Sequence, residues 1–406
     1  MTSADSSDAL RRRPDLFVAV LIAIATTAIY LCTASRDPSS FDYFVRLADA
    51  FLHGRIYLTD APSWLNELIF RNGVYYVAYP PMPAILLMPF VAVWGSSFPQ
   101  QVASCLFGGV SVGLAYLVFG EFAIRDRVRF LLTAVFGFGT VLWFVSEVGS
   151  VWYISHSAAE MLSLVALLFA LRRERPLAVG LFLGMAAISR LPVGLTAPFY
   201  LAMLLDLGFP PRLPADLAAA VRRTLLFLLG LAVPVGLYLV YNYARWGGIV
   251  DESYVLIPGV LQDPIYAKHG ILSIWYIPRH IYAIFLRSWN FVDDPPYFQP
   301  SWWGLSIFLT TPLFGWLGRA RLWRDPRVTW AAIGIALGLV PIVTHGNVGI
   351  SQFGYRFSLD VQPLLFVVLA TVFERGMSRW AVAAAVASIA ICAYALWAIS
   401  IGFVAY

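Results

Sequence analysis

The chain has 406 residues, of which 60% are apolar, 16% are aromatic and only 13% are charged, and its net charge is +5. An average soluble domain is roughly one quarter charged and under half apolar, and one soluble core could not bury this excess of apolar surface. The composition therefore excludes a soluble enzyme, a disordered chain and a nucleic-acid-binding module, and it indicates a protein that crosses a membrane several times.

The N-terminal segment has the pattern of a signal anchor. Arg11 to Arg13 precede an apolar run near 15–33, which is long enough to span a bilayer. Because basic residues concentrate on the cytoplasmic side of membrane proteins, residues 1–14 are predicted to form a cytoplasmic tail.

Short arginine clusters recur between the later apolar runs, and with the N-terminal cluster they contain eighteen of the 28 basic residues. Placing every cluster in the cytoplasm predicts eleven transmembrane helices, with the N-terminus inside and the C-terminus outside. The predicted spans are 15–33, 100–122, 130–147, 156–171, 177–189, 191–206, 224–243, 302–318, 328–345, 356–373 and 380–402.

Two apolar segments do not read as simple spans. The pair 177–206 could form two short helices that meet at Arg190–Leu191–Pro192, or one long broken helix. Segment 81–95 has only about 15 apolar residues, too few for a full span, and is predicted to be a re-entrant or interfacial helix.

The predicted topology is asymmetric. The cytoplasmic connections are short and basic, whereas the outer loops 34–99, 244–301 and 345–355 are long and hold most of the other ionisable residues. The first outer loop contains a predicted hairpin around Asn72-Gly73, because Asn-Gly suits a type I′ turn. Chemistry is therefore expected on the outer face, where no ATP or sugar nucleotide is available.

The stretch SSFDYFVRLADAFLHGRIYL, residues 39–58, predicts an amphipathic helix that opens at Asp42, with Ser39 or Ser40 as its cap. Asp42 and Asp49 are seven residues apart and share one face with Arg46. These charges could serve a site, or they could be the capping and solvated charges of an interfacial helix.

A second stretch, SEVGSVWYISHS, carries Glu147 and His156 at a predicted membrane boundary. Ionisable groups there are costly and therefore indicate function, although simple interfacial solvation is an equal alternative. Glu160 lies one turn after His156 and could pair with His156 or with Arg190.

A third stretch, QFGYRFSLD, places Arg356 at the outer start of a span. A guanidinium there suits a phosphate group, whereas the alternative is snorkelling or an ion pair with Asp360 one turn later. Asn242 and Arg245 similarly end the span 224–243.

Loop 246–301 adds Lys268 and the adjacent acids Asp293 and Asp294. These two acids could bind a metal, but Asp-Pro turns use the same residues for local hydrogen bonds. No P-loop, HExxH or GxSxG motif is present, and few ionisable residues lie inside the spans, which disfavours a hydrolase triad and an ion-coupled transporter.

The chain resembles the GT-C superfamily of membrane glycosyltransferases, in particular the protein O-mannosyltransferase and lipid A aminoarabinose transferase branch. The resemblance rests on the order of four elements. These are the acidic helix start FDYFVRLADAFLHGRIYL, the segment YPPMPAILLMPFVAVWG, the pair GLFLGMAAISRLPVGLTAPFYLAML, and the late motifs YNYARWGGIVDESY and FGYRFSLDVQP.

The resemblance implies an all-α GT-C fold with a transmembrane catalytic module over 15–245, an outer loop with an interfacial helix over 246–301 and C-terminal helices over 302–406. It also implies a multi-pass protein of the bacterial plasma membrane. The donor would be a polyprenyl-phosphate sugar, and the acceptor a lipid, glycan or protein on the extracytoplasmic face. No nucleic acid is expected as a partner.

The resemblance assigns roles to individual residues of an inverting enzyme. Asp42 would be the general base, and Glu147 or His156 would orient Asp42, the acceptor or a metal. The donor phosphate would bind Arg356 first and Arg245 second, with Tyr355 beside Arg356. Residues supporting the acceptor would be Asp49, Arg46, Asn242 and Lys268.

Metal dependence stays open at this point, with Mg²⁺ or Mn²⁺ as the candidate cation. Two alternative functions also remain. One is a lipid-linked glycan flippase or transporter, and the other is an oligosaccharide polymerase or ligase that consumes diphosphate-linked donors.

Overall fold

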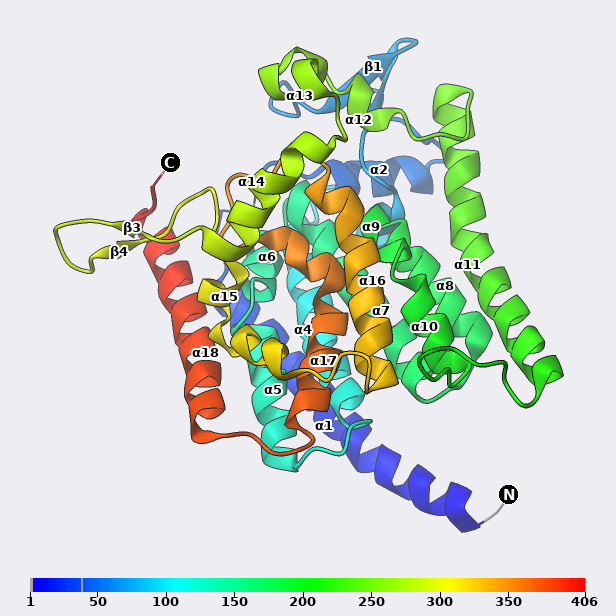
Figure 1. The fold of residues 1–406 in the computed structure, drawn as a ribbon. Coiled ribbons are helices and arrows are strands. Elements are labelled where there is room, and N and C mark those ends of the chain that lie inside the picture. The colour runs from blue at the N-terminus through cyan, green and yellow to red at the C-terminus, as the bar shows by residue number, and fades with distance from the viewer. Residues whose placement is uncertain (1–2, 38, 406) are drawn as a thin grey trace.

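The computed structural model describes residues 3–37 and 39–405, with side chains from residue 14 onward, so the predicted contribution of Arg11–Arg13 lies outside the described side chains. The fold is a helical bundle with little sheet (Figure 1). Its bundle elements are α1 (Ser3–Thr33), α4 (Gln100–Phe119), α5 (Asp126–Phe138), α6 (Leu142–Val148), α7 (Val151–Leu171), α8 (Pro176–Ala187), α9 (Leu191–Gly194), α10 (Ala197–Leu204), α11 (Leu217–Trp246), α15 (Ile307–Thr310), η4 (Pro312–Arg319), α16 (Pro326–Val343), η5 (Arg356–Val361), α17 (Gln362–Phe373) and α18 (Arg379–Ser400).

Seven helices in the described part of the chain are long and apolar enough to cross a membrane, and the bent pair α5–α6 adds an eighth if it is one span. Each of the eleven predicted spans coincides with a helical segment. However, α8 has 12 residues, α9 and α10 together cover 191–204, and the segment 302–318 is divided into α15 and η4. The predicted count of eleven is therefore not confirmed, because three of these segments are shorter than a bilayer-spanning helix.

The breaks follow from local backbone chemistry. Thr311 precedes Pro312 and is extended, with φ −129° and ψ 77°, because the proline ring disfavours a helical conformation in the residue before it. Arg190 is likewise extended, with φ −143° and ψ 103°, just before α9. Of the two alternatives for 177–206, the structure therefore has two short helical stretches that meet at Arg190.

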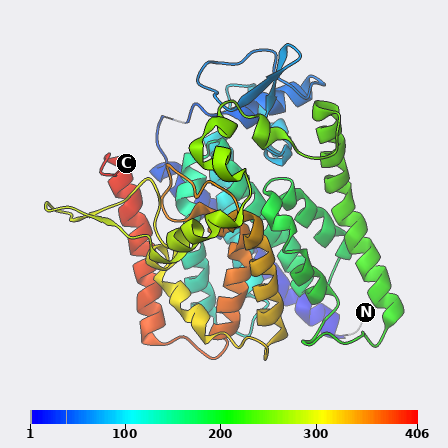
Figure 2. The same cartoon turned by 45° about the horizontal axis from the view of Figure 1, so that its top comes forward.

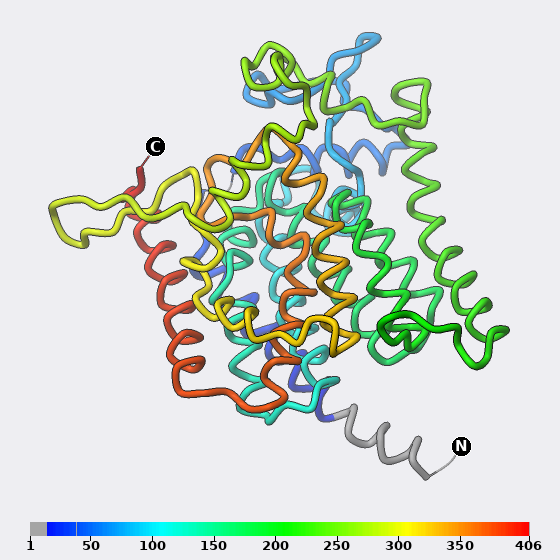
Figure 3. Tube along the Cα trace, in the orientation of Figure 1, coloured from blue at the N-terminus to red at the C-terminus, as the bar shows by residue number. Residues whose placement is uncertain are grey.

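The two ends of the bundle differ in their connections (Figures 1 and 3). The basic end consists of the short connections 120–125, 172–175, 205–216, 320–325 and 374–378. The loop end consists of the long segments 34–99, 247–306 and 344–355, and the C-terminal residues join it through Trp302 N–H, which donates to Ala405 O at 2.9 Å. The predicted arginine clusters fall in the short connections or in the first turns that follow them, so the predicted asymmetry is present.

The loop end has its own small elements: α2 (Tyr43–Leu52), β1 (Leu68–Arg71), β2 (Val74–Val77), α3 (Met82–Trp94), α12 (Ser253–Leu256), α13 (Pro264–His269), α14 (Ile277–Ile281), β3 (Asn290–Phe291) and β4 (Phe298–Gln299). Figure 2 shows α2, the β1–β2 hairpin and the α12–α13 segment gathered over this end. The predicted hairpin is confirmed: Arg71 pairs with Val74, and Asn72 and Gly73 have φ values of 53° and 80°, as a type I′ turn requires.

A second apolar core anchors α2 beneath the loops. Tyr43, Phe44 and Leu47 are fully buried, and they pack with Leu87 of α3 and Ile154 of α7. The 13-residue α3 lies in the segment predicted to be re-entrant or interfacial. The apolar face of α2 therefore turns inward, and the charged face that carries Asp42 and Arg46 stays partly open.

Helix α11 approaches α8 through two glycines. A Cβ on Gly180 would lie 1.9 Å from the Phe227 carbonyl oxygen, and a Cβ on Gly230 would lie 2.1 Å from the Leu177 carbonyl oxygen. Small residues at such crossings let membrane helices touch through their backbones. This packing brings the end of α11, with Arg245, next to the first long loop.

Candidate functional site

Asp42 stands at the N-cap position of α2, which begins at Tyr43, one residue later than predicted. Ser39 Oγ accepts from the backbone N–H of Phe41 at 3.3 Å and does not cap the helix. The Arg46 Nε donates to Asp42 Oδ1 at 2.8 Å, and the two side chains are 29% and 24% exposed. The pair fixes one carboxylate oxygen across one helical turn, as expected for residues four apart.

Asp49 lies on the same helix but is not part of that pair. Its carboxylate is 3.7 Å from His53 Nδ1, and His53 is largely exposed. Of the two acids predicted to share a face with Arg46, only Asp42 pairs with it among the described residues.

Glu147 is buried near the end of α6 and is held by the end of α1. Thr33 Oγ1 donates to Glu147 Oε1, and the Trp143 indole N–H donates to Thr33 Oγ1 at 3.1 Å. The Gln101 amide also donates to the Glu147 carbonyl at 2.6 Å. These contacts join α1, α4 and α6, and within the described residues no hydrogen bond links Glu147 to Asp42.

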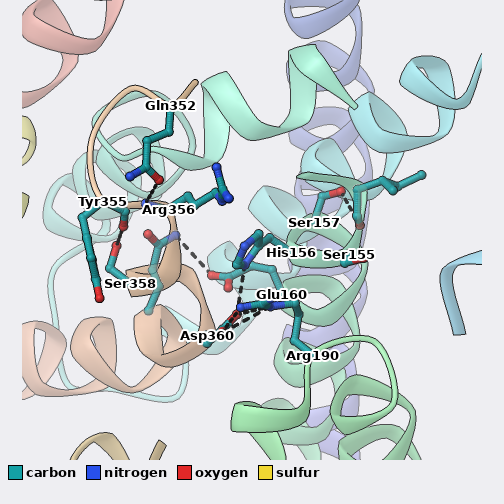
Figure 4. A network of polar contacts seen from close by, with 12 residues as sticks. Ser155, His156, Ser157, Glu160, Arg190, Gln352, Tyr355, Arg356, Ser358 and Asp360 are labelled. Carbon is teal, nitrogen blue, oxygen red and sulfur yellow. Dashed lines mark hydrogen bonds and ion pairs between the residues drawn. The ribbon is translucent and has the colours of Figure 1, made fainter. Parts of the chain in front are cut away.

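His156, Asp360 and Arg190 form a buried network inside the bundle (Figure 4). Asp360 Oδ1 lies 2.9 Å from His156 Nδ1, and Asp360 Oδ2 accepts from Arg190 Nη2 at 2.8 Å. The Asp360 and His156 side chains are completely buried, whereas Arg190 is 24% exposed. The network joins α7, the α8–α9 break and η5, and the His156 Nε2 is buried without a hydrogen-bond partner.

The ion pairs considered as alternatives for Glu160 and Arg356 are not formed. Glu160 pairs with neither His156 nor Arg190, and instead accepts from Gln362 Nε2 at 3.1 Å. Arg356 does not pair with Asp360, and Figure 4 shows its guanidinium directed away from that carboxylate. The reason is that residues 356–361 form a 3₁₀ helix, in which residues four apart no longer share a face.

Arg356 is 7% exposed and retains donors that the described residues do not use. Its Nη1 donates to the Ile350 carbonyl at 3.0 Å, whereas its Nε is buried without a partner. The guanidinium carbon lies 5.2 Å from the centre of the Tyr153 ring and 5.1 Å from that of Phe357. The aromatic rings stabilise the cation.

Tyr355 differs from its neighbour. It is fully buried, and its hydroxyl lies 2.6 Å from His280 Nδ1, while His280 Nε2 lies 2.8 Å from the His345 carbonyl oxygen. These contacts tie η5 to α14 and to segment 344–355. The Tyr355 hydroxyl therefore has a structural partner already.

Two of the three guanidinium nitrogens of Arg245 have partners, whereas its Nε is buried without a partner among the described residues, as the Nε of Arg356 is. Nη1 donates to the Val77 carbonyl at 2.9 Å and Nη2 to Asn242 Oδ1 at 2.7 Å, and the guanidinium is packed between Tyr241 and Trp246. These contacts fasten the end of α11 to β2. Lys268 is exposed on α13, and among the described residues no hydrogen bond or ion pair joins it to the other predicted site residues.

Glu67 is a site residue that the sequence did not indicate. Its Oε2 accepts from the Trp152 indole N–H at 2.9 Å and from the Tyr79 hydroxyl. Burial raises the pKa of Glu67, while these hydrogen bonds and the charge of Arg356 lower it. A lone Glu before a hairpin strand carries no motif that could have revealed these contacts.

No three His, Cys, Asp or Glu side chains among the described residues lie close enough to hold a metal ion. Asp42 is engaged by Arg46, and Glu147 by Thr33, so these two acids do not fit a shared divalent cation. Asp293 and Asp294 belong to the turn between β3 and β4, where Tyr297 N–H donates to the Asp294 carbonyl at 3.0 Å. This agrees with the turn alternative for these acids.

No protein-family model and no curated protein matches the sequence. Among solved structures, the chain is similar to ArnT from Cupriavidus metallidurans bound to undecaprenyl phosphate, with a TM-score of 0.53 and 13% identity over 93% of this chain and 63% of the ArnT chain. The apo state of ArnT gives a TM-score of 0.51, 14% identity, and coverage of 93% and 61%. The chain is less similar to the S. cerevisiae protein O-mannosyltransferase Pmt1-Pmt2 complex bound to the sugar donor. That likeness has a TM-score of 0.39 and 16% identity, and it covers 71% of this chain and 38% of the other.

Proposed function

We propose that this multi-pass membrane protein, whose fold is the GT-C fold of ArnT, is a glycosyltransferase that uses a polyprenyl-phosphate sugar. The chain spans under two thirds of the length of the ArnT structure, at 63%. One observation carries the proposal: the loop end combines a half-open carboxylate on α2 with an arginine on η5 that packs against aromatic rings and whose Nε has no partner among the described residues. Transfer from a lipid phosphate needs both kinds of group.

The side of the membrane follows from the charges. Arginine-rich connections gather at the basic end, which by the positive-inside rule faces the cytoplasm. The loop end then faces outward, where nucleotide sugars are absent. A donor carried by a membrane lipid fits this location, because its sugar phosphate arrives at the bilayer surface while its chain stays in the hydrocarbon.

The proposed reaction is a direct displacement with inversion. The acceptor hydroxyl oxygen bonds to the anomeric carbon, the bond between that carbon and the phosphate oxygen breaks, and the hydroxyl proton passes to the Asp42 carboxylate. Arg46 orients the carboxylate through Oδ1, and no described residue donates to Oδ2. The phosphate leaves as the polyprenyl monophosphate, and Arg356 stabilises its growing charge.

The remaining predicted residues take positioning roles in this proposal. His156 and Asp360 brace η5, which carries Arg356, and Glu147 braces α6 against α1. Arg245 and Asn242 fasten α11 to the first long loop. No step passes through a metal, because the acids near Asp42 do not form a cation site in the described residues.

The test is transfer from a radiolabelled polyprenyl-phosphate sugar by the purified protein, with a membrane lipid and glycan extract as acceptor. Asp42→Asn should lower turnover by about 10²–10⁴-fold, the usual contribution of a general base. Asp60→Asn is the matched control, since Asp60 is exposed in the same loop.

Three outcomes would contradict the proposal. Wild-type turnover in Asp42→Asn would remove Asp42 as the base. Transport of the intact lipid-linked sugar across a vesicle membrane, without transfer, would support a flippase. Turnover of diphosphate-linked donors alone would support a polymerase or ligase.

A further inference from the structure

Glu67 is held in place by three segments that are far apart in the sequence. Its backbone N–H donates to the Tyr43 hydroxyl of α2 at 3.1 Å. Its Oε2 accepts from Trp152 at the start of α7 and from Tyr79 before α3, and the Trp152 indole nitrogen also lies 2.6 Å from the Tyr79 hydroxyl. The carboxylate orientation is therefore determined by tertiary contacts.

The two carboxylate oxygens of Glu67 have different environments. Oε2 accepts both side-chain hydrogen bonds, whereas no described residue donates to Oε1. Oε1 is also absent from the buried unpartnered atoms, so it remains accessible. One acceptor atom would be enough to hold Tyr79 and Trp152 in place. A carboxylate has a second oxygen, and its half-buried position raises the pKa of Glu67.

The surroundings of Glu67 combine a cation with aromatic rings. The charge of Arg356 acts on Glu67, and the charges of Glu67, Arg356 and Arg190 all act on the pKa of Tyr254. Tyr254 packs edge-on against His345, with 4.9 Å between ring centres. Trp152 packs against Phe41, the residue before Asp42, with 4.7 Å between ring centres. Glu67 is therefore linked through Trp152 to Phe41, the residue before the proposed base.

We propose that Glu67 Oε1 binds a hydroxyl group of the sugar that the lipid donor carries, and that Glu67, Tyr79 and Trp152 form its sugar subsite. This inference rests on the function proposed above. A sugar hydroxyl would donate to Oε1, which accepts from no described residue. Trp152 and Tyr79 hold the carboxylate and add apolar surface for the sugar ring.

The test compares two ligands, bare undecaprenyl phosphate and undecaprenyl-phosphate sugars, in equilibrium binding to the purified protein. A small set with glucose, mannose and arabinose identifies the sugar lipid that binds best. Wild type should prefer that lipid over the bare phosphate. Glu67→Gln should lose about tenfold in affinity for the sugar lipid, as for one hydrogen bond to a charged group, and should bind the bare phosphate as wild type does.

Two further variants sharpen the test. Trp152→Phe keeps an aromatic ring but removes the N–H donor, so it should lose sugar-lipid affinity in the same direction and to a smaller extent. Asp60→Asn should bind both ligands as wild type does. Unchanged affinity for the bare phosphate shows that each variant is folded.

The outcomes separate the two levels of the proposal. Glu67→Gln with the wild-type ratio of affinities, or with both affinities lowered equally, overturns the sugar subsite. A wild type that does not distinguish the sugar lipids from the bare phosphate also overturns it. A wild type that binds none of these lipids overturns the proposed function itself.

Discussion

The two ends of the bundle use their charges in different ways. At the basic end, Arg172 Nε donates to Glu121 at 2.6 Å and Arg327 to Glu374 at 2.8 Å. The side chains of these pairs are 18% to 33% exposed, and they join one short connection to the next. At the loop end, Arg190, His156 and Asp360 are drawn into the bundle, and Arg356 keeps a buried Nε without a partner.

This difference separates topology from function. Exposed pairs contribute about 0–1 kcal/mol each, so the basic end needs its arginines mainly to define the side of the membrane. Burying a charge costs several kcal/mol unless the charge is paired. If stability were their only role, apolar side chains at the loop end would serve as well as these buried charges. Their retention inside a membrane protein is the physical argument for a site there.

The largest effect is expected from breaking the buried network. Asp360→Leu removes the carboxylate and leaves Arg190, which is 24% exposed, without its partner. This should lower the free energy of unfolding by about 3 kcal/mol, at the low end for a broken buried pair because solvent reaches Arg190. The measurement is thermal or denaturant unfolding in detergent. The double variant Asp360→Leu with Arg190→Met should recover part of the loss, because no unpaired charge remains. A double variant no more stable than Asp360→Leu would show that the ion pair is not the cause.

The next effect distinguishes the two candidate phosphate arginines. Arg356→Met should weaken binding of bare undecaprenyl phosphate by about tenfold or more, since a charge-assisted hydrogen bond is lost. Arg245→Met should instead lower the unfolding free energy by about 2 kcal/mol, because α11 loses its bond to Val77. Arg279→Met is the control, as Arg279 donates to the Gly346 carbonyl at the same end. Stronger loss of binding in Arg245→Met than in Arg356→Met would reverse these roles.

At the basic end the expected effect is small. Arg173 pairs with Asp206, and their side chains are 49% and 64% exposed. Arg173→Ala should therefore change the free energy of unfolding by no more than about 0.5 kcal/mol, and less at high salt. A loss comparable with that of Asp360→Leu would contradict the distinction between the two ends.

The smallest effect is the dependence of stability on pH, which should have opposite signs at the two ends. Burial raises the pKa of Glu67 above its ordinary 4.5, so the folded protein binds the Glu67 proton more tightly than the unfolded chain does. The folded protein therefore loses stability as pH rises above about 4.5. For Asp325, burial raises the pKa, but hydrogen bonds and charge from Arg327 outweigh it and bring the pKa below its ordinary 3.8. Asp325 thus contributes stability above that value, which is lost as pH falls.

Unfolding temperatures between pH 3 and pH 7 check both signs. The stability of Glu67→Gln relative to wild type should increase as pH rises above about 4.5. Asp325→Asn should lose less stability than wild type as pH falls below about 3.8. The same sign for both variants would show that one of the two environments has been misassigned.

Several features could be predicted because they depend on neighbours in the chain. Apolar runs locate the helices, and Asn72-Gly73 determines the hairpin turn. The acidic start of α2 and the order of the motifs were sufficient to predict the GT-C fold, and the likeness to ArnT supports that prediction. The predicted number of spans was not confirmed, because a helix break at Arg190 or Thr311 shortens a segment without changing its hydropathy.

The sequence by itself determined that this is a multi-pass membrane protein with a basic end, long loops at the other end, and Asp42 and Arg356 among those loops. Only the tertiary structure decided the partners: Asp360 for His156 and Arg190, Val77 for Arg245, and Trp152 for Glu67. The reason is physical. Hydropathy and turn chemistry act within a few residues, whereas a buried charge is matched by whichever segment packs against it, which here is between about 80 and 200 positions away.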